Sequence, residues 1–254
     1  MEQKIILITQ ARVGSSRLPF KVLKEINGAP LLKIHIDRIL KSKLINEFIV
    51  ATTILEEDNL IIDIAKKCNV NFYRGSENDV LDRYYQSIKN RDADWIVRVT
   101  SDCPLIDSKL LDSIITEVVN KNYDYGSNTL TNSYPDGQDV EIIKFSALKK
   151  AWENATLKSD REHVTTYIKN NSTFFKKSFF TALSIESPID FSNIRMTVDE
   201  NEDFEAITIL VKKLGLDANW LEYANFISNN NNFFTNQNIK RNEGYLISLK
   251  NDNV

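Results

Sequence analysis

Short apolar runs and amphipathic stretches alternate along the first half of the chain. The apolar runs are rich in β-branched residues, as buried strands are. They predict strands at Lys4–Thr9, Phe48–Thr52, Val70–Tyr73 and Trp95–Thr100. The stretches between them place apolar residues at helical spacing, and they predict helices that begin at Pro30 and that cover Asp58–Cys68, Asp79–Ile88 and Ser108–Val119. Because strands that alternate with such helices indicate βαβ units, we expect a doubly wound α/β fold with a mainly parallel, Rossmann-like sheet.

The pattern is less regular in the second half of the chain. Tyr123–Leu130 and Asp139–Ile143 flank a turn at Tyr134–Gly137 and predict a small, hairpin-like β excursion. Further elements are expected as helices at Phe145–Asn154, at Arg161–Lys169, from Asn201 onward and at Leu216–Phe226, and as a strand at Arg195–Asp199. Since no repeat or clear linker interrupts the chain, we interpret residues 1–254 as one domain in which residues 123–190 form the excursion.

Composition restricts the possible partners. The 254 residues carry a net charge of −3, so the chain as a whole is not drawn to nucleic acid or to an anionic membrane, and an anion site must be a local cluster of cations. Cys68 and Cys103 form neither a CxxC pair nor a disulfide framework, and the first residues lack the features of a signal peptide. Apolar runs stay well below the ~18 residues of a membrane span. We therefore expect a cytoplasmic protein without a membrane or nucleic-acid partner.

The loop from Gln10 to Lys21 follows the first expected strand, which is where α/β folds bind phosphate. It combines cations with small residues, namely Arg12, Gly14, Ser15, Arg17 and Lys21. Arginine can hold phosphate oxygens in a bidentate fork, lysine acts as a mobile point charge, and small residues let backbone N–H groups come close. The spacing matches neither the P-loop nor the dinucleotide GxGxxG motif. A phosphate site and a solvated basic loop that caps the first helix therefore explain this pattern about equally well.

Two aspartates are predicted at strand ends that lie far apart in the sequence. Asp102 follows the fourth strand, and Asp199 ends the strand expected at Arg195–Asp199. Carboxylates at one edge of a sheet could hold Mg²⁺ over a triphosphate, because Mg²⁺ binds a few carboxylate oxygens together with phosphate oxygens. The alternative is that both aspartates cap the next turn or helix. Asp107 is interpreted as the cap of the helix that follows it.

Other polar residues could reach a nucleotide from the third and fourth strands. Ser76 and Asp79 could exchange hydrogen bonds with a base or an acceptor, and Arg83 could contact phosphate. The alternative is that Asn78 or Asp79 caps a helix and that Asp82 and Arg83 lie on the surface. Arg98 lies inside the fourth strand. Since arginine is almost never buried alone, Arg98 either pairs with a carboxylate or points toward the nucleotide.

Several of these segments resemble one family. The string Ala-Arg-x-x-Ser-Ser-Arg-Leu-Pro-x-Lys at 11–21 resembles the N-terminal signature of the sugar-activating cytidylyltransferases, a group that includes the 3-deoxy-manno-octulosonate and acylneuraminate cytidylyltransferases. Family-like motifs also occur at Asn27–Leu31, Asp102–Asp107 and Thr197–Glu205. Motifs similar to those of the SpsF-like branch occur at Tyr134–Glu141, Arg161–Thr165 and Asn242–Leu246. The resemblance implies a fold of the nucleotide-diphospho-sugar transferase type.

The resemblance assigns a nucleotide site and a metal site to this chain. It implies that the loop wraps the phosphates of CTP and that Asp102 and Asp199 carry Mg²⁺. The expected nucleotide-binding residues are Gln10, Ala11, Arg12, Gly14, Ser15, Arg17, Lys21, Ser76, Arg98 and Asp102, with catalytic roles for Arg12, Arg17, Lys21 and Asp102. Three residues depart from the family pattern: Gln10 replaces a common proline, and Phe20 and Ser101 replace glycines. The first two could alter the shape of the loop.

The resemblance also implies an acceptor site beneath the excursion, in a homodimer. The expected acceptor-binding residues are Asp136, Gln138, Asp139, Glu141 and His163. A lone histidine on a helix is more often structural, as we expect for His35. The implied reaction transfers CMP from CTP to a sugar acid or a sugar or polyol phosphate for a surface glycan and releases pyrophosphate. A GT-A-like glycosyltransferase, a non-catalytic nucleotide-binding protein, and uridylyl or adenylyl transfer stay open as alternatives. The residues name neither the acceptor nor a general base.

Overall fold

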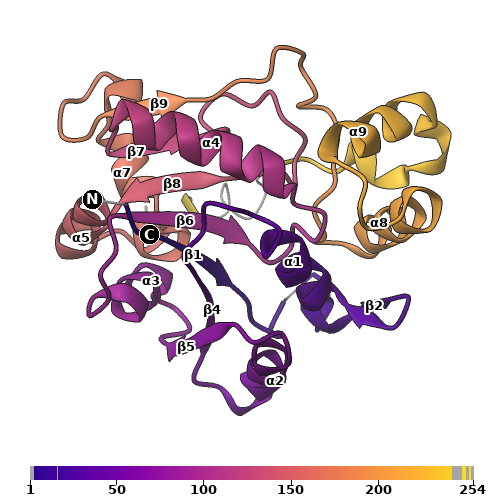
Figure 1. The fold of residues 1–254 in the computed structure, drawn as a ribbon, viewed down its shortest axis with the longest axis horizontal. Helices are drawn as coiled ribbons and strands as arrows, with labels where there is room; N and C mark the ends of the chain where they lie inside the picture. Colours follow the sequence, from indigo (N-terminus) through magenta and orange to yellow (C-terminus); the bar gives the residue numbers. More distant parts are fainter. Residues whose placement is uncertain (1–2, 16, 242–247, 250–251, 253–254) are drawn as a thin grey trace.

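The computed structural model describes residues 3–15, 17–241, 248–249 and 252. Within them the strands are β1 (Ile5–Gln10), β2 (Glu25–Ile26), β3 (Ala29–Pro30), β4 (Glu47–Thr53), β5 (Asn71–Gly75), β6 (Trp95–Thr100), β7 (Tyr125–Ser127), β8 (Glu141–Lys144) and β9 (Ala182–Ser184) (Figure 1). The α-helices are α1 (Leu31–Ile39), α2 (Asn59–Lys67), α3 (Val80–Ile88), α4 (Ser108–Lys121), α5 (Phe145–Asn154), α6 (Lys158–His163), α7 (Thr166–Asn170), α8 (Asn201–Leu214) and α9 (Trp220–Asn229). Short 3-10 helices are η1 (Lys21–Leu23), η2 (Glu56–Asp58), η3 (Thr173–Phe175), η4 (Asn231–Phe233) and η5 (Thr235–Asn238).

Seven of these strands form one sheet in the order β5-β4-β1-β6-β8-β7-β9. The strands β5, β4, β1 and β6 pair in parallel, so their carboxyl ends lie at one edge. Strand β8 is antiparallel to β6 and to β7, and β9 is parallel to β7. The prediction of a doubly wound, mainly parallel α/β fold is therefore confirmed. The excursion extends this sheet with its own strands.

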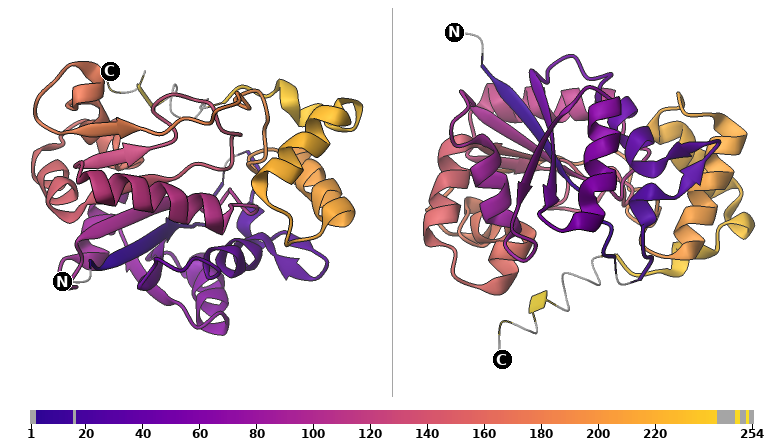
Figure 2. Two further views of the ribbon diagram at one scale, coloured as in Figure 1. Left: turned by 45° about the horizontal axis from the view of Figure 1, so that its top comes forward. Right: turned by 90° about the horizontal axis from the view of Figure 1, so that it is seen from below.

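Alternating side chains of the buried strands enter two separate cores. Ile5 and Leu7 of β1 pack with α1, α2 and α4, whereas Ile6 and Ile8 pack with α3, α5 and α7 on the opposite face. A third core joins α8 and α9 to the start of α1. The views in Figures 1 and 2 place α8 and α9 at one side of the molecule and the excursion helices at the other. The strand ends between them are left for the candidate site.

Several elements differ from the sequence-based expectation, for physical reasons. The helix expected at Arg161–Lys169 is divided into α6 and α7, because Val164 between them has φ 63°. The strand expected at Arg195–Asp199 is an extended segment with one isolated bridge, between Asp136 and Arg195. The last long helix begins only at Trp220, where the Asn219 side chain accepts from two backbone N–H groups.

The hairpin β2–β3 was not expected, although its two-residue turn is Asn27–Gly28. Both turn residues have positive φ, which the pair Asn-Gly accommodates well. None of the helices that the structure describes combines the length and the apolar composition needed to cross a bilayer. The motif at Asn242–Leu246 lies outside the described residues.

Candidate active site

A cavity of about 790 Å³ lies beside the loop that follows β1, and we call it the loop cavity. Ala11, Arg12, Ser15, Arg17 and Lys21 line one side of it, and residues of α3 and α6 line the other. The loop is anchored at Val13, whose N–H donates to the buried Asp58 carboxylate at 2.8 Å. Phe20 adopts φ 56°, the region that favours glycine, so the family's glycine at this position matches the backbone conformation. Phe20 keeps that conformation at a cost in strain.

A second cavity of about 420 Å³ lies beneath the excursion, and we call it the excursion cavity. Its lining includes Asp136, Asp139, Glu141, His163 and Lys169. The two cavities share Gln10, Arg17, Thr100, Asp102, His163 and Asp199. They therefore meet at the carboxyl ends of β1 and β6, beside the two aspartates predicted as metal ligands.

Lys21 joins these two aspartates at the junction of the cavities. Its Nζ lies 2.8 Å from Asp199 Oδ1 and 3.4 Å from Asp102 Oδ2, and it donates to the Val198 carbonyl at 2.8 Å. Burial would lower the pKa of Lys21, but the two carboxylates outweigh it and raise that pKa. Burial would raise the pKa of Asp102, but Lys21 and a hydrogen bond from Thr100 hold it below its ordinary value. The junction therefore contains two carboxylates around one ammonium group.

The other loop cations also contact carboxylates. Arg17 Nη2 lies 3.1 Å from Asp199 Oδ1, and its Nη1 lies 3.3 Å from Glu200. Arg12 pairs with Glu77 at 3.3 Å across the mouth of the loop cavity, and both side chains are exposed. An exposed pair of this kind contributes little to stability, so a ligand phosphate can compete for the Arg12 guanidinium at small cost.

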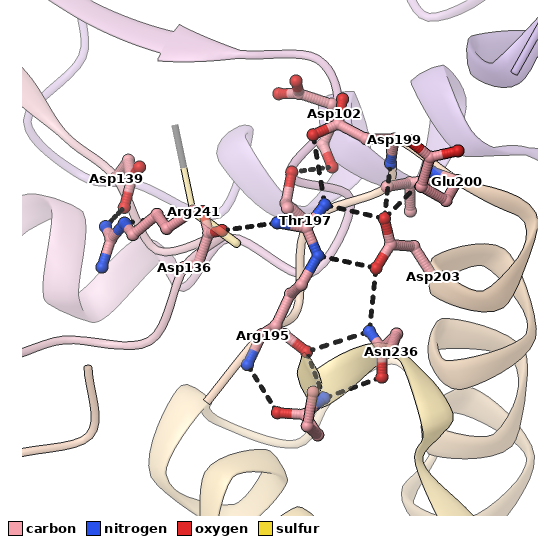
Figure 3. Close-up of polar contacts among 12 residues, drawn as sticks. Asp102, Asp136, Asp139, Arg195, Thr197, Asp199, Glu200, Asp203, Asn236 and Arg241 are labelled. Carbon is pink, nitrogen blue, oxygen red and sulfur yellow. Dashed lines mark hydrogen bonds and ion pairs between the residues drawn. The ribbon is translucent and has the colours of Figure 1, made fainter. Parts of the chain in front are cut away.

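Asp199 is placed by the extended segment 194–199 (Figure 3). This segment is bonded on both sides: Met196 N–H donates to the Asp136 carbonyl at 2.7 Å, and Val198 N–H donates to the Asp102 carbonyl at 2.8 Å. It therefore links the excursion turn to the loop after β6 and brings Asp199 to Asp102.

Arg195 of the same segment is buried among three carboxylates. It bonds Asp136 at 2.8 Å, Asp199 at 3.2 Å and both oxygens of Asp203 at 2.8 Å (Figure 3). Burial would lower the pKa of Arg195, but Asp203 and the other carboxylates raise it. The Asn236 Nδ2 group donates a hydrogen bond to Asp203 Oδ1 at 2.9 Å. This network fixes one oxygen of Asp199 to the protein core.

Asp136 and Asp139 form an acidic pair in the excursion cavity. Arg241 lies 2.5 Å from Asp139 and 3.8 Å from Asp136. Burial and then the charge of Asp139 raise the pKa of Asp136 to about 7, against the opposing effect of Arg241 and Arg195. Burial also raises the pKa of Asp139, although Arg241 opposes this. Two carboxylates predicted for acceptor binding thus lie together under one arginine.

Glu141, also predicted for acceptor binding, is already surrounded by donors. Tyr125 and Thr165 hydroxyls donate to its Oε1 at 2.6 Å, Arg98 bonds its Oε2, and Lys169 Nζ lies 3.6 Å away. Burial would raise the pKa of Glu141, but Arg98 and Lys169 lower it to about 2. Glu141 therefore remains ionised and holds two cations at the edge of the excursion cavity.

Three of the predicted site residues lie outside the linings of both cavities, which corrects the positions expected for them. Gln138 is fully buried, and its amide bonds Asp107 N–H and the Leu105 carbonyl, so it braces the turn and is not available to an acceptor. Ser76 is exposed and its hydroxyl accepts from Asp79 N–H at 3.1 Å, so it belongs to the turn before α3. Gly14 is exposed and lies outside the lining of both cavities. Arg98 lines the excursion cavity and pairs with Glu141, which is the first of the two options expected for it, and its assignment to the nucleotide stays a prediction.

Three roles expected from local chemistry are also seen. The Asp107 carboxylate accepts from Lys109 and Leu110 N–H groups and caps α4, as expected. Asp79 caps α3 through Asp82 N–H and also pairs with Arg161 at 2.6 Å. His35 is fully buried and bonds Thr9 and the Cys103 carbonyl, which fits its expected structural role.

Sequence reasoning missed Lys169, Arg195, Asp203 and Arg241 as parts of the site. Arg195 and Asp203 lie in the segment that resembles the family's second aspartate motif, and this offered a signal. The sequence offered no signal for Lys169 and Arg241, because their partners are distant in the sequence. Tertiary contacts bring them to the cavity, Lys169 beside Glu141 and Arg241 beside Asp136 and Asp139.

The donor set at the junction suits Mg²⁺ only in part. Within the described residues, groups of three or more His, Cys, Asp and Glu side chains arranged to hold a metal ion are absent. Asp102 and Asp199 nevertheless supply the oxygen ligands that Mg²⁺ prefers, and Mg²⁺ is commonly bound by one or two carboxylates together with substrate phosphates. The pair therefore fits a metal ion that arrives with a nucleotide.

Comparisons with known proteins agree with this geometry. A family model described as cytidylyltransferase matches residues 6–241. An uncharacterized protein of Methanocaldococcus jannaschii is 42% identical over 215 residues, which cover 84% of this chain and 85% of that protein. The spore coat polysaccharide biosynthesis protein SpsF of Bacillus subtilis is 33% identical over 218 residues, 83% of this chain and 88% of that protein.

A solved structure extends the likeness to the fold. The structure of a cytidylyltransferase from Leptospira borgpetersenii superposes with a TM-score of 0.85 at 30% identity, covering 95% of this chain and 100% of that chain. The residues 6–241 that the family model matches include the loop after β1, Asp102 and the segment 194–199. The chain therefore belongs to the cytidylyltransferase family and is a nucleotidyltransferase that uses CTP.

Proposed function

We propose that this enzyme transfers CMP from CTP to a sugar acid or to a sugar or polyol phosphate, with Mg²⁺, and releases pyrophosphate. The observation that carries the proposal is the position of Lys21, which contacts both Asp102 and Asp199 where the two cavities meet. A triphosphate in the loop cavity and an acceptor in the excursion cavity would meet at this point. The name of SpsF, a spore coat polysaccharide biosynthesis protein, favours an acceptor that belongs to a surface glycan.

The residues of the loop would bind and orient the triphosphate. Arg12, Arg17 and Lys21 offer three cationic groups around the loop cavity, which offset the charge of the phosphates. Phosphoryl and nucleotidyl transfer depend mainly on positioning and electrostatic stabilisation, so such groups account for much of the catalysis. Mg²⁺ bound to Asp102 and Asp199 would offset the charge that develops on the α-phosphate and on pyrophosphate.

Asp199 is suited to this task because its two oxygens have different partners. Oδ1 contacts Lys21 and Arg17 of the loop, whereas Oδ2 contacts the buried Arg195. Oδ2 therefore stays oriented from the core when a ligand enters the loop cavity. In the transfer itself, an acceptor oxygen bonds the α-phosphorus while the bond from that phosphorus to the pyrophosphate oxygen breaks.

A pyrophosphate-release assay tests the proposal. Each nucleoside triphosphate is combined with Mg²⁺ and a panel of sugar acids, sugar phosphates and polyol phosphates. We expect release with CTP and at least one of these acceptors, and we expect chelation of Mg²⁺ to abolish it. Asp102→Asn and Lys21→Met should each lower kcat by about 10²-fold or more, the usual scale for a lost electrostatic contact to the transition state.

Asp63→Asn is the matched control, because Asp63 is an exposed aspartate on α2, away from both cavities. It should retain the wild-type rate. CTP binding without turnover across the whole panel would contradict the proposal and favour a nucleotide-binding protein. Equal turnover with UTP or ATP would contradict the choice of nucleotide.

A further inference from the structure

His163 lies at the junction of the two cavities and has no role in the function proposed so far. It is the last residue of α6 and lines both the loop cavity and the excursion cavity. Of the described residues shared by the two linings, Arg17, Asp102 and Asp199 are already assigned to phosphate and metal. Gln10 and Thr100 do not titrate near neutral pH. His163 is therefore the remaining shared side chain that can accept a proton there.

The backbone after His163 is strained. Val164 has φ 63° and ψ −53°, and Thr165 N–H donates to the His163 carbonyl at 2.6 Å. This is a γ-turn with positive φ, a rare conformation that is costly for a β-branched residue. The Val164 side chain is fully buried, and Thr165 Oγ1 donates to Glu141 at 2.6 Å. Such strain persists where the surroundings enforce it, often at functional sites.

Burial and the charged groups around His163 keep its imidazole neutral. Burial, and then Arg98 of β6 and Lys169 of α7, lower its pKa to about 4, against the opposing effect of Glu141 of β8 and Asp252. Ser248 Oγ lies 2.6 Å from Nε2 and orients the ring. At neutral pH the ring can therefore accept a proton.

Arg98 and Lys169 connect this property to the acceptor. Both cations line the excursion cavity, where a carboxylate or phosphate of the acceptor would find them. An anion bound there offsets the two positive charges that disfavour protonation of the imidazole. The proton affinity of His163 would thus increase once the acceptor is bound.

We propose that His163 is the general base for the acceptor hydroxyl, an inference that rests on the proposed function. The acceptor oxygen forms its bond to the α-phosphorus of CTP, and its proton passes to the imidazole of His163. The bond between the α-phosphorus and the oxygen of the β-phosphate breaks, and pyrophosphate leaves with that electron pair. The loss of His163 removes the proton acceptor and leaves the loop that binds the triphosphate.

The test compares His163→Ala and His163→Gln with wild type, with and without added imidazole. Loss of a general base typically lowers the rate by 10²–10⁴-fold, so we expect kcat to fall by about 10²-fold or more. The affinity for CTP, measured by calorimetry, should stay within about threefold, which also shows that the variants fold. Free imidazole should restore part of the His163→Ala rate in proportion to its unprotonated fraction. Asp102→Asn should show no such rescue.

The chain offers a matched control, because it contains only two histidines. His35→Gln removes the other, buried imidazole, and any loss of rate in that variant should not respond to imidazole. A near-wild-type kcat for His163→Ala would overturn the inference while the proposed function stands. So would a rise in acceptor KM alone without rescue, because it indicates a binding role. Absence of turnover in the wild type would contradict the proposed function and the inference together.

Discussion

Replacing Gly137 with alanine tests how the excursion fixes the segment that carries Asp199. Gly137 follows Asp136 in the excursion turn and has φ 105°, a conformation that residues with a side chain rarely adopt. A Cβ atom built there would lie 2.6 Å from the Met196 carbonyl carbon and 2.7 Å from Thr197 N. These are backbone atoms, so a rotamer change cannot relieve the clash. The segment 194–199 or the turn must move.

The expected cost has two parts. Forcing extra volume into a packed site costs about 1–3 kcal/mol, and a left-handed conformation costs a residue with a side chain about 1–2 kcal/mol. Gly137→Ala should therefore lower the free energy of unfolding by about 2–5 kcal/mol. Gly28→Ala provides the matched control, because Gly28 has φ 78° and nothing lies within 4 Å of the added Cβ. It should show only the conformational part, about 1–2 kcal/mol.

Urea unfolding of both variants, followed by circular dichroism, measures these costs. Pyrophosphate release is then measured under conditions in which both variants are fully folded. We expect Gly137→Ala to lose turnover and Gly28→Ala to retain it, because only the first change pushes on the segment beside Asp199. If the two variants are equally stable and equally active, the contact between the turn and this segment does not position Asp199, and the reasoning is refuted.

Three further changes test other parts of the structure. Glu141→Gln should lower the free energy of unfolding by about 3 kcal/mol at neutral pH, because the pKa of Glu141 falls from 4.5 to about 2 on folding. Urea unfolding should show the full difference between variant and wild type above pH 4.5, and this difference should shrink as the pH falls toward 2. Burial lowers the pKa of His35 from 6.5 to about 4, so the unfolded chain takes up the proton first and about 3 kcal/mol of stability is lost as the pH falls from 6.5 to 4. His163 titrates in the same window, so the test is the comparison of wild type with His35→Gln, whose pH profile should be shallower by that amount; parallel profiles would contradict it. Phe20→Gly should raise the free energy of unfolding by about 1 kcal/mol, since it relieves a left-handed residue whose side chain is exposed; a lower thermal midpoint would count against this explanation.

The alternation of apolar runs and amphipathic stretches predicted the sheet well, because burial on both faces leaves a strong pattern in the sequence. Trp95–Thr100 and Phe145–Asn154 have the predicted bounds. The rule that ligands bind at the carboxyl ends of parallel strands led to the loop after β1 and to Asp102 without any contact information. Local chemistry also predicted caps such as Asp107. These features depend on residues that are close together in the chain.

The ion pairs of the site could not be predicted in this way. Arg98 was recognised as a buried arginine in need of a partner, but the sequence offers many carboxylates and does not show that β8 lies beside β6. Gln138 was assigned to the acceptor because its segment resembles a motif of the SpsF-like branch, whereas the turn directs its side chain into the core. The division between α6 and α7 at Val164 breaks a pattern that reads as one helix, because tertiary contacts there override the local preference.

The network around Arg195 connects the two cavities. Arg195 is buried and contacts Asp136 of the excursion cavity, Asp199 of the junction and Asp203 of α8. Removing one partner would leave a buried charge uncompensated, a change that typically costs about 3–5 kcal/mol. The carboxylate proposed for metal binding and the acidic pair proposed for the acceptor are thus held by the same guanidinium group. Arg195 therefore contacts Asp199 from the side of the excursion cavity, whereas Lys21 and Arg17 contact it from the loop cavity.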